Sequence, residues 1–320
     1  MTATPEHSDD HRRVIGRLGI DQRRALVAQS DGPALLRIAL HLGAVAATAS
    51  YAALQLPLWP LAVLAEAIVL TFLFAPLHEC IHGTAFRSDR LNRITAHICG
   101  FLVLLTPSHF RYFHLAHHRF THDPDRDPEL GHPKPVTLGA HIVYLSGLPA
   151  WWSRIKGLAT EAWGHAPPAY VPRRGEARVR REARAYLAAY AGLLTVSLGL
   201  GSPLLLLIWV LPHLLGQPLM RAYLLAEHTG CPHSDNMLLN TRTTFTTGAI
   251  QWLAWNMPYH TEHHAYPAVP FHQLPKLHVL IQDDLGTTAD GYVRFNARHI
   301  AGLAATTDTA ANRPRTAENR

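Results

Sequence analysis

The chain has 320 residues, of which 48% are hydrophobic and only 16% are charged, and its formal net charge is +6. Soluble domains average nearer a quarter charged residues, so this composition is unusual for a soluble domain. Three cysteines exclude a disulfide framework and a CxxC site. A cleaved secretory signal needs an apolar segment, and because the start of this sequence is polar, none is expected. No nucleic-acid partner is expected.

The first half of the chain predicts one membrane hairpin. Residues 1–30 are predicted to form a polar, basic tail. The apolar runs 34–56 and 59–77 follow, and the first is long enough to cross a hydrocarbon core of roughly 30 Å. The next apolar run, 94–106, is short for a span, so we interpret it as a re-entrant or interfacial helix.

The second half predicts another hairpin. Residues 136–152 end in two tryptophans and are predicted to form a helix at the membrane interface. Two apolar runs, 186–200 and 203–220, are joined by a Gly-Ser-Pro turn. Residues 241–300 are predicted to form a cytosolic cap and residues 304–320 a disordered tail.

The predicted fold is therefore an all-α integral membrane domain over residues 31–300. It has four transmembrane helices in two hairpins, interfacial helices and a cytosolic helical cap. Four crossings place the arginines of the N-terminal tail, of 87–93 and of 173–184 on one side, which the positive-inside rule makes cytoplasmic. Both termini and the histidine clusters described below are expected on that side, at the inner membrane if the protein is bacterial.

Three histidine clusters, here called boxes 1, 2 and 3, read HECIH (78–82), HLAHH (114–118) and HTEHH (260–264). Spacings of three and four place side chains on one face of a helix, and neutral imidazole is a common metal ligand. The boxes hold more ligands than one tetrahedral ion needs, so they predict a two-metal site. The expected ligands are His78, His82, His114, His117, His118, His260, His263 and His264.

The order of these boxes resembles the membrane fatty-acid desaturase superfamily, which includes acyl-lipid desaturases, hydroxylases and carotenoid ketolases. The HEC opening of box 1 and the prolines after box 3, Pro267 and Pro270, resemble the acyl-lipid branch. The similarity covers roughly residues 50–285. The resemblance implies a di-iron centre, four transmembrane helices, a cytosolic histidine cap and oxygen-dependent attack on an unactivated C–H bond.

In several members of this superfamily a further histidine lies at the end of the fourth span. His228 occupies that place and is a ninth expected ligand. Some members also have an asparagine four residues earlier that reaches a metal through water. This chain has Leu224 there, so the feature is not carried over, although Asn256 is four residues before His260.

Acidic residues beside the boxes are candidates for orienting the metal-bound rings, because such rings usually donate their second N–H to a carboxylate or carbonyl. We expect Glu79, Glu227, Glu262 and Asn256 in this role. Asp123, Asp125 and Asp127 are also close in sequence, but a solvated loop explains Asp125 and Asp127 equally well. A separate hypothesis pairs Glu66 with His213 at the far end of a substrate tunnel, since both lie inside predicted spans.

The predicted function is a membrane-bound di-iron oxidoreductase that uses O2 and external electrons to desaturate a fatty acyl chain or related lipid. A separate carrier, such as ferredoxin or cytochrome b5 with its reductase, would supply the electrons, because no iron–sulfur cysteine pattern is present. Zinc can replace iron in purified protein. The alternatives are a lipid hydroxylase or carotenoid ketolase with the same site and, more remotely, a zinc-dependent membrane hydrolase.

Overall fold

The computed structural model describes residues 10–164 and 167–311, which form mostly helices. The expectation of a helical protein is therefore confirmed. Two short helices precede the first long one, and box 2 ends the seventh. In chain order these are α1 (His11–Arg17), α2 (Ile20–Leu26), α3 (Asp31–Ala53), α4 (Trp59–Thr71), α5 (Phe74–His82), α6 (Asp89–Leu102) and α7 (Pro107–Phe120).

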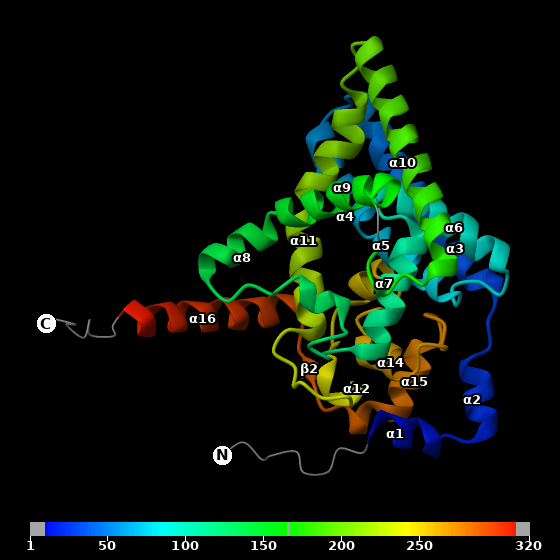
Figure 1. Ribbon diagram of the computed structural model, residues 1–320, viewed down its shortest axis with the longest axis vertical. Coiled ribbons are helices and arrows are strands. Elements are labelled where there is room, and N and C mark those ends of the chain that lie inside the picture. Colours follow the sequence, from blue (N-terminus) through cyan, green and yellow to red (C-terminus); the bar gives the residue numbers. More distant parts are fainter. Residues whose placement is uncertain (1–9, 165–166, 312–320) are drawn as a thin grey trace, which may run out of the picture.

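The remaining helices carry the chain from box 2 to the C-terminal region (Figure 1). They are η1 (Pro128–Gly131), α8 (Leu138–Leu145), α9 (Leu148–Trp163), α10 (Arg173–Gly199), η2 (Leu206–Val210), α11 (Leu211–His228), α12 (Met237–Asn240), α13 (Gly248–Leu253), α14 (His260–Ala265), α15 (Leu274–Ile281), η3 (Gln282–Asp284) and α16 (Tyr292–Ala311).

A small sheet departs from the predicted all-α fold. Strands β1 (Thr243–Thr244) and β2 (Thr288–Ala289) pair in parallel, with Thr243 opposite Thr288. Two-residue strands are too short to give the alternating pattern that predicts a strand from sequence. The pairing joins the segment before box 3 to the segment after it and so closes the predicted cap.

Two helical stretches among the described residues are long and apolar enough to cross a membrane, Ile20–Ala53 and Trp59–His82. They include the first predicted hairpin. In the second predicted hairpin, α10 rises to the top of Figure 1, and the chain returns from there through η2 to α11 near the centre of the picture. Its helices are less uniformly apolar, because α10 begins with an arginine-rich half and α11 contains His213, Gln217 and Arg221.

The two hairpins meet where α11 packs along α4. Gly216 on α11 makes this close approach possible, because a Cβ at that position would collide with the carbonyl oxygen of Ala67 and the side chain of Thr71. Small residues allow helix backbones to approach closely, above all in membranes. Gly216 therefore sets the spacing between α11, which ends at His228, and α4, which precedes the helix of box 1.

The described parts of both predicted tails contain helices. Within the predicted N-terminal tail, α1 lies against α14, and the backbone N–H of Met237 donates to Nδ1 of His11. At the other end α16 extends to Ala311, into the stretch predicted to be disordered from residue 304. Residues 1–9 and 312–320 lie outside the described part of the chain.

The Gly216 contact gives a testable prediction. Gly216→Ala should lower the free energy of unfolding by about 1–3 kcal/mol, since overpacking a tight contact forces the backbone apart. Thermal unfolding in detergent measures the change. The matched control is Gly192→Ala on α10, where a Cβ meets nothing within 4 Å and the better helix propensity of alanine should leave stability equal or higher. Equal destabilisation by both substitutions would contradict this role.

Candidate metal centre

Each histidine box lies on a short helical segment that its flanking residues define. Box 1 ends α5, which stops at Gly83 in a left-handed conformation (φ 79°), a common helix end. Box 2 lies on α7, which begins at Pro107, a residue suited to a first helical position. Box 3 forms α14 directly after a turn in which Trp255 and Asn256 both have positive φ.

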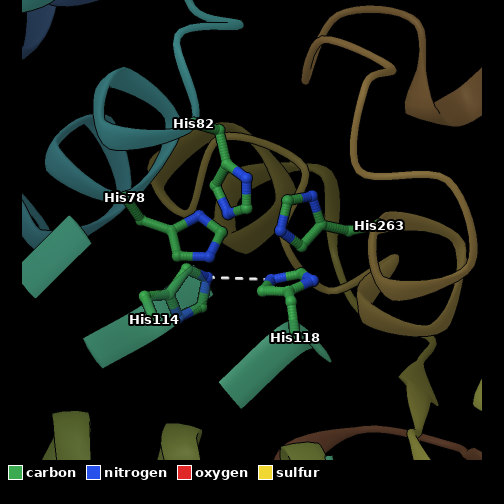
Figure 2. A group of neighbouring side chains, drawn as sticks. All are labelled: His78, His82, His114, His118 and His263. Carbon is green, nitrogen blue, oxygen red and sulfur yellow. Dashed lines mark hydrogen bonds between the residues drawn. The ribbon is translucent and has the colours of Figure 1, made fainter. Parts of the chain in front are cut away.

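The first group of rings combines all three boxes. It consists of His78, His82, His114, His118 and His263, whose ligand atoms all lie within 4.8 Å of one another. Figure 2 shows these rings facing a common centre from separate segments. The Nε2 atoms of His114 and His118 are 2.9 Å apart. This is an arrangement in which one ion can be shared.

The second group contains His117, His228 and His264, again with ligand atoms within 4.8 Å of one another. His260 lies against it, because its Nε2 is 3.2 Å from Nε2 of His228. The two groups touch where the rings of His118 and His264 stack, with centroids 3.9 Å apart. The nine expected ligands therefore lie together, in two adjacent groups.

The buried ring nitrogens test whether these groups fit metal ions. Among the described residues, buried nitrogens without a hydrogen-bond partner include both of His78 and His263, and Nε2 of His264. Leaving such an atom unpaired costs about 1–3 kcal/mol. Burial also lowers the pKa of His118, His263 and His264 well below its usual value. Burial thus favours the neutral form of these three rings, which is the form that binds metal, and the residues fit a pair of ions.

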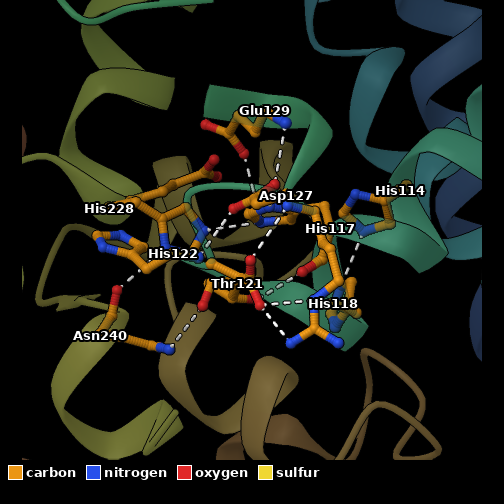
Figure 3. A network of polar contacts seen from close by, with 12 residues as sticks. His114, His117, His118, Thr121, His122, Asp127, Glu129, His228 and Asn240 are labelled. Atoms are coloured by element: carbon orange, nitrogen blue, oxygen red, sulfur yellow. Dashed lines mark hydrogen bonds and ion pairs between the residues drawn. The ribbon is translucent and has the colours of Figure 1, made fainter. Parts of the chain in front are cut away.

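In two of the rings a hydrogen bond occupies Nδ1 and leaves Nε2 as the nitrogen that can bind a metal. Nδ1 of His117 donates to Oδ1 of Asp127 at 3.0 Å, and Nδ1 of His228 donates to the carbonyl oxygen of Asn240 at 3.2 Å (Figure 3). Both rings then present Nε2, and these two atoms are 3.2 Å apart. Asp127 is buried, whereas Asp125 is exposed to solvent. Of these two aspartates, Asp127 contacts a ring, and Asp125 is a solvated loop residue.

Glu79 and Asn256 do not orient imidazoles as predicted. Oε2 of Glu79 accepts from the N–H of Phe271, and Nδ2 of Asn256 donates to the carbonyl oxygen of Phe271. Consecutive helical residues project about 100° apart, so Glu79 points away from the face that His78 and His82 share. Instead, the two side chains clamp one backbone position after box 3 against the helix of box 1.

Glu262 and Glu227 also differ from the prediction. Glu262 accepts hydrogen bonds from Oγ1 of Thr243 and from Nδ1 of His278, each at 2.5 Å. Neither partner is a proposed metal ligand, so Glu262 stabilises the cap and does not orient a ring. Oε2 of Glu227 lies 3.8 Å from Nε2 of His260, on the side of that ring which faces His228.

The predicted pairing of Glu66 with His213 is not formed. Glu66 accepts a hydrogen bond from Thr48 on α3, and Nε2 of His213 donates to the carbonyl oxygen of Leu102 at 2.5 Å. Equal depth in two helices does not bring side chains together when each helix turns its polar residue toward a different neighbour. Neither residue lines the large cavity described below.

A half-buried ion pair beside the second group was not found from sequence. Nζ of Lys134 lies 2.6 Å from Oε1 of Glu129, and Oε2 of Glu129 lies 3.3 Å from Nε2 of His117. Burial opposes ionisation of Glu129, but Lys134 and His117 hold its pKa well below the usual value. The only signal in the sequence is an acidic residue in the loop that leaves box 2.

A cavity of about 710 Å³ reaches both groups of rings. This volume is within the range of ordinary ligand pockets. His78, His114, His117 and His260 form part of its wall. Most of the remaining lining is apolar, and Glu129, Lys134, Arg154, Arg221 and Glu227 are among its polar members. The apolar wall includes Phe72, Phe74, Leu104, Leu105, Phe110, Phe113, Leu158, Met220, Leu224 and Met257.

The structure is that of a helical protein with apolar segments long enough to cross a membrane and two histidine groups that fit a metal site. Residues 54–296, most of the chain, match the fatty acid desaturase family. The chain belongs to this family, which confirms the resemblance found in the sequence.

Curated relatives are desaturases of differing substrates. A sphingolipid delta(4)-desaturase of Drosophila melanogaster is 25% identical over 209 residues, which are 64% of this chain and 60% of that enzyme. A dihydrorhizobitoxine desaturase of Bradyrhizobium elkanii is 26% identical over 72% of this chain and 69% of its own length. An sn-1 oleoyl-lipid 12-desaturase of a Picosynechococcus strain is 33% identical over 31% of this chain and 29% of its own length.

The Asp127 contact gives a testable prediction. Asp127→Asn should weaken metal binding about 10–100-fold, because the ring of His117 loses the carboxylate that fixes its orientation. Titration of the purified, metal-free protein with Co²⁺ measures the affinity. Asp125→Asn, in the same loop but exposed, is the matched control and should bind as the wild type does. Unchanged affinity in the Asp127 variant would refute the orienting role.

Proposed function

We propose that this protein is a membrane-bound oxidoreductase that holds two iron ions and uses O2 and external electrons to desaturate a fatty acyl chain or a related lipid. The observation that carries the proposal is the opening of two adjacent histidine groups onto one largely apolar cavity. Family membership and the desaturase names of the relatives support the reaction type.

Two iron ions held by these rings would supply the activation of oxygen that breaking an unactivated C–H bond requires. The protein's own contribution is position. An apolar chain in the cavity contacts Phe74, Phe110 and Leu105 and lies against the rings of His78 and His114. Fixing one segment of a flexible chain beside the reacting centre is worth several kcal/mol of the barrier. The same walls exclude water.

We further propose the four-span arrangement predicted from sequence, with the rings at the cytoplasmic side. The end of α10 and the segment that leads through η2 toward α11 support it, because their apolar side chains are exposed and would face lipid. These include Leu194, Val196, Leu198, Leu200, Leu204 and Leu206. An apolar surface of this extent is rare on a soluble monomer.

An electron carrier, such as ferredoxin or cytochrome b5, is proposed to dock at a basic cleft of about 340 Å³. Its lining includes His82, a member of the first group of rings. Three exposed arginines, Arg93, Arg111 and Arg178, outnumber its two acidic residues, Asp89 and Glu182. The positive charge of the cleft favours an acidic partner protein. Because His82 lines the cleft, a carrier bound there would have a short path for electrons to the first group of rings.

The catalytic proposal is tested by lipid profiling of cells that express the protein. The wild type should produce a lipid that has lost two hydrogens, as mass spectrometry detects. His263→Ala should reduce this product to background, since a ring of the first group is removed. The control is His141→Ala, which removes a buried histidine of α8 that is not part of the cavity wall and should retain the activity.

Two other results would contradict the proposal. A product that gains oxygen would identify a hydroxylase or ketolase with the same site. Turnover that persists without oxygen in zinc-loaded protein would identify a hydrolase.

The docking proposal has its own test. Arg178→Glu should raise the KM for an acidic carrier and make the rate less sensitive to salt, because less positive charge remains in the cleft for salt to screen. Steady-state turnover with ferredoxin and with a small chemical reductant measures this, and only the ferredoxin rate should change. Equal loss with both reductants would reject the cleft as the docking site.

A further inference from the structure

The second group of rings has a carboxylate on its open side. Nδ1 of His117 is bound to Asp127, so Nε2 is the atom that this ring offers to a metal. Oε2 of Glu129 lies 3.3 Å from that atom, and Nε2 of His228 lies 3.2 Å from it. Glu129 therefore approaches the same nitrogen, at nearly the same distance, as a ring of the group.

These separations are those of atoms that share an ion. Zinc–nitrogen and zinc–oxygen bonds of roughly 2.0–2.2 Å, at angles between right-angled and tetrahedral, place neighbouring ligand atoms about 3.0–3.4 Å apart. The contacts from Nε2 of His117 to Glu129 and His228 both lie in this range. Glu227 does not, because its oxygen is 3.8 Å from Nε2 of His260.

Lys134 completes the arrangement. It holds Oε1 of Glu129 at 2.6 Å and leaves Oε2 turned toward His117. Ligating carboxylates are normally fixed by a hydrogen bond of this kind to the other oxygen. Asp127, the residue that caps the start of η1, also holds Glu129 in place, because its Oδ1 accepts from the backbone N–H of Glu129 at 2.9 Å. One loop thus positions both the carboxylate and the ring beside it (Figure 3).

We propose that Glu129 is a ligand of the second metal, which makes the pair of sites unlike: the first is formed by histidines alone and the second by histidines and one carboxylate. This inference rests on the proposed two-metal function. Because Glu129 also lines the cavity, the ligand lies on the side of the second site where substrate is expected.

The test uses the purified full chain loaded with Co²⁺ or with ⁵⁷Fe. In Glu129→Gln the second site should bind Co²⁺ about tenfold more weakly or worse, by analogy with the loss of a metal-supporting group, while the first site keeps its affinity. Mössbauer spectra of the iron-loaded wild type should show two distinct iron signals, of which one changes in the variant. Neither measurement depends on activity.

Glu161→Gln is the matched control. Glu161 lines the same cavity and is mostly buried, but its partner is Nδ1 of His109 at 2.8 Å, so both metal sites should match those of the wild type. If Glu129→Gln does not fold, the zinc-loaded wild type answers the question by structure determination. A carboxylate oxygen within about 2.0–2.2 Å of the second ion supports the ligand, and a separation above 3 Å overturns it.

The outcomes separate this inference from the proposed function. A wild type that binds two metals, with Glu129→Gln indistinguishable from it in Co²⁺ affinity and Mössbauer spectrum, overturns the ligand role of Glu129 and leaves the oxidoreductase intact. A wild type that binds no pair of metals overturns both.

Discussion

The structure depends on one constraint: many imidazole rings are buried together without enough protein partners for their nitrogens. Buried polar atoms are almost always paired, and a site that leaves both nitrogens of His78 and of His263 unpaired is costly in the absence of ions. Metal ions remove this cost because each neutral nitrogen becomes a ligand. The centre is therefore a source of folding stability when it is filled as well as a place for chemistry.

Much of the surrounding architecture brings distant segments to this point and holds them there. The clamp of Glu79 and Asn256 on Phe271 ties box 1 to the loop after box 3. The sheet of β1 and β2 closes the cap, and Gly216 sets the distance between α4 and α11. Each of these contacts joins residues far apart in sequence, which is why none of them has a local signal in the chain.

What the sequence predicted well is what helical periodicity controls. The spacing within each box indicated which faces carry the rings, and the apolar runs indicated the helices. What it predicted poorly is the direction of side chains next to the boxes. Glu79 and Glu262 are adjacent to ring-bearing residues, and that adjacency turns them away from the rings. Asp127 and Glu129 reach the rings because they lie in a loop and a 3₁₀ turn, whose path sequence periodicity does not determine.

The same periodicity explains why the boxes differ. Box 1 has its histidines four apart, on one helical face, and both join the first group. Boxes 2 and 3 each end in two consecutive histidines, and consecutive residues point about 100° apart. On α7, His118 joins the first group while His117 faces the second; on α14, His263 joins the first while His264 faces the second. Two helices that each carry such a pair can fill two neighbouring sites, whereas one site would leave half of these rings unused. The paired histidines are thus the feature of the sequence that predicts two metals, and the loop after box 2 brings the carboxylate of Glu129 to 3.3 Å from a ring of the second group.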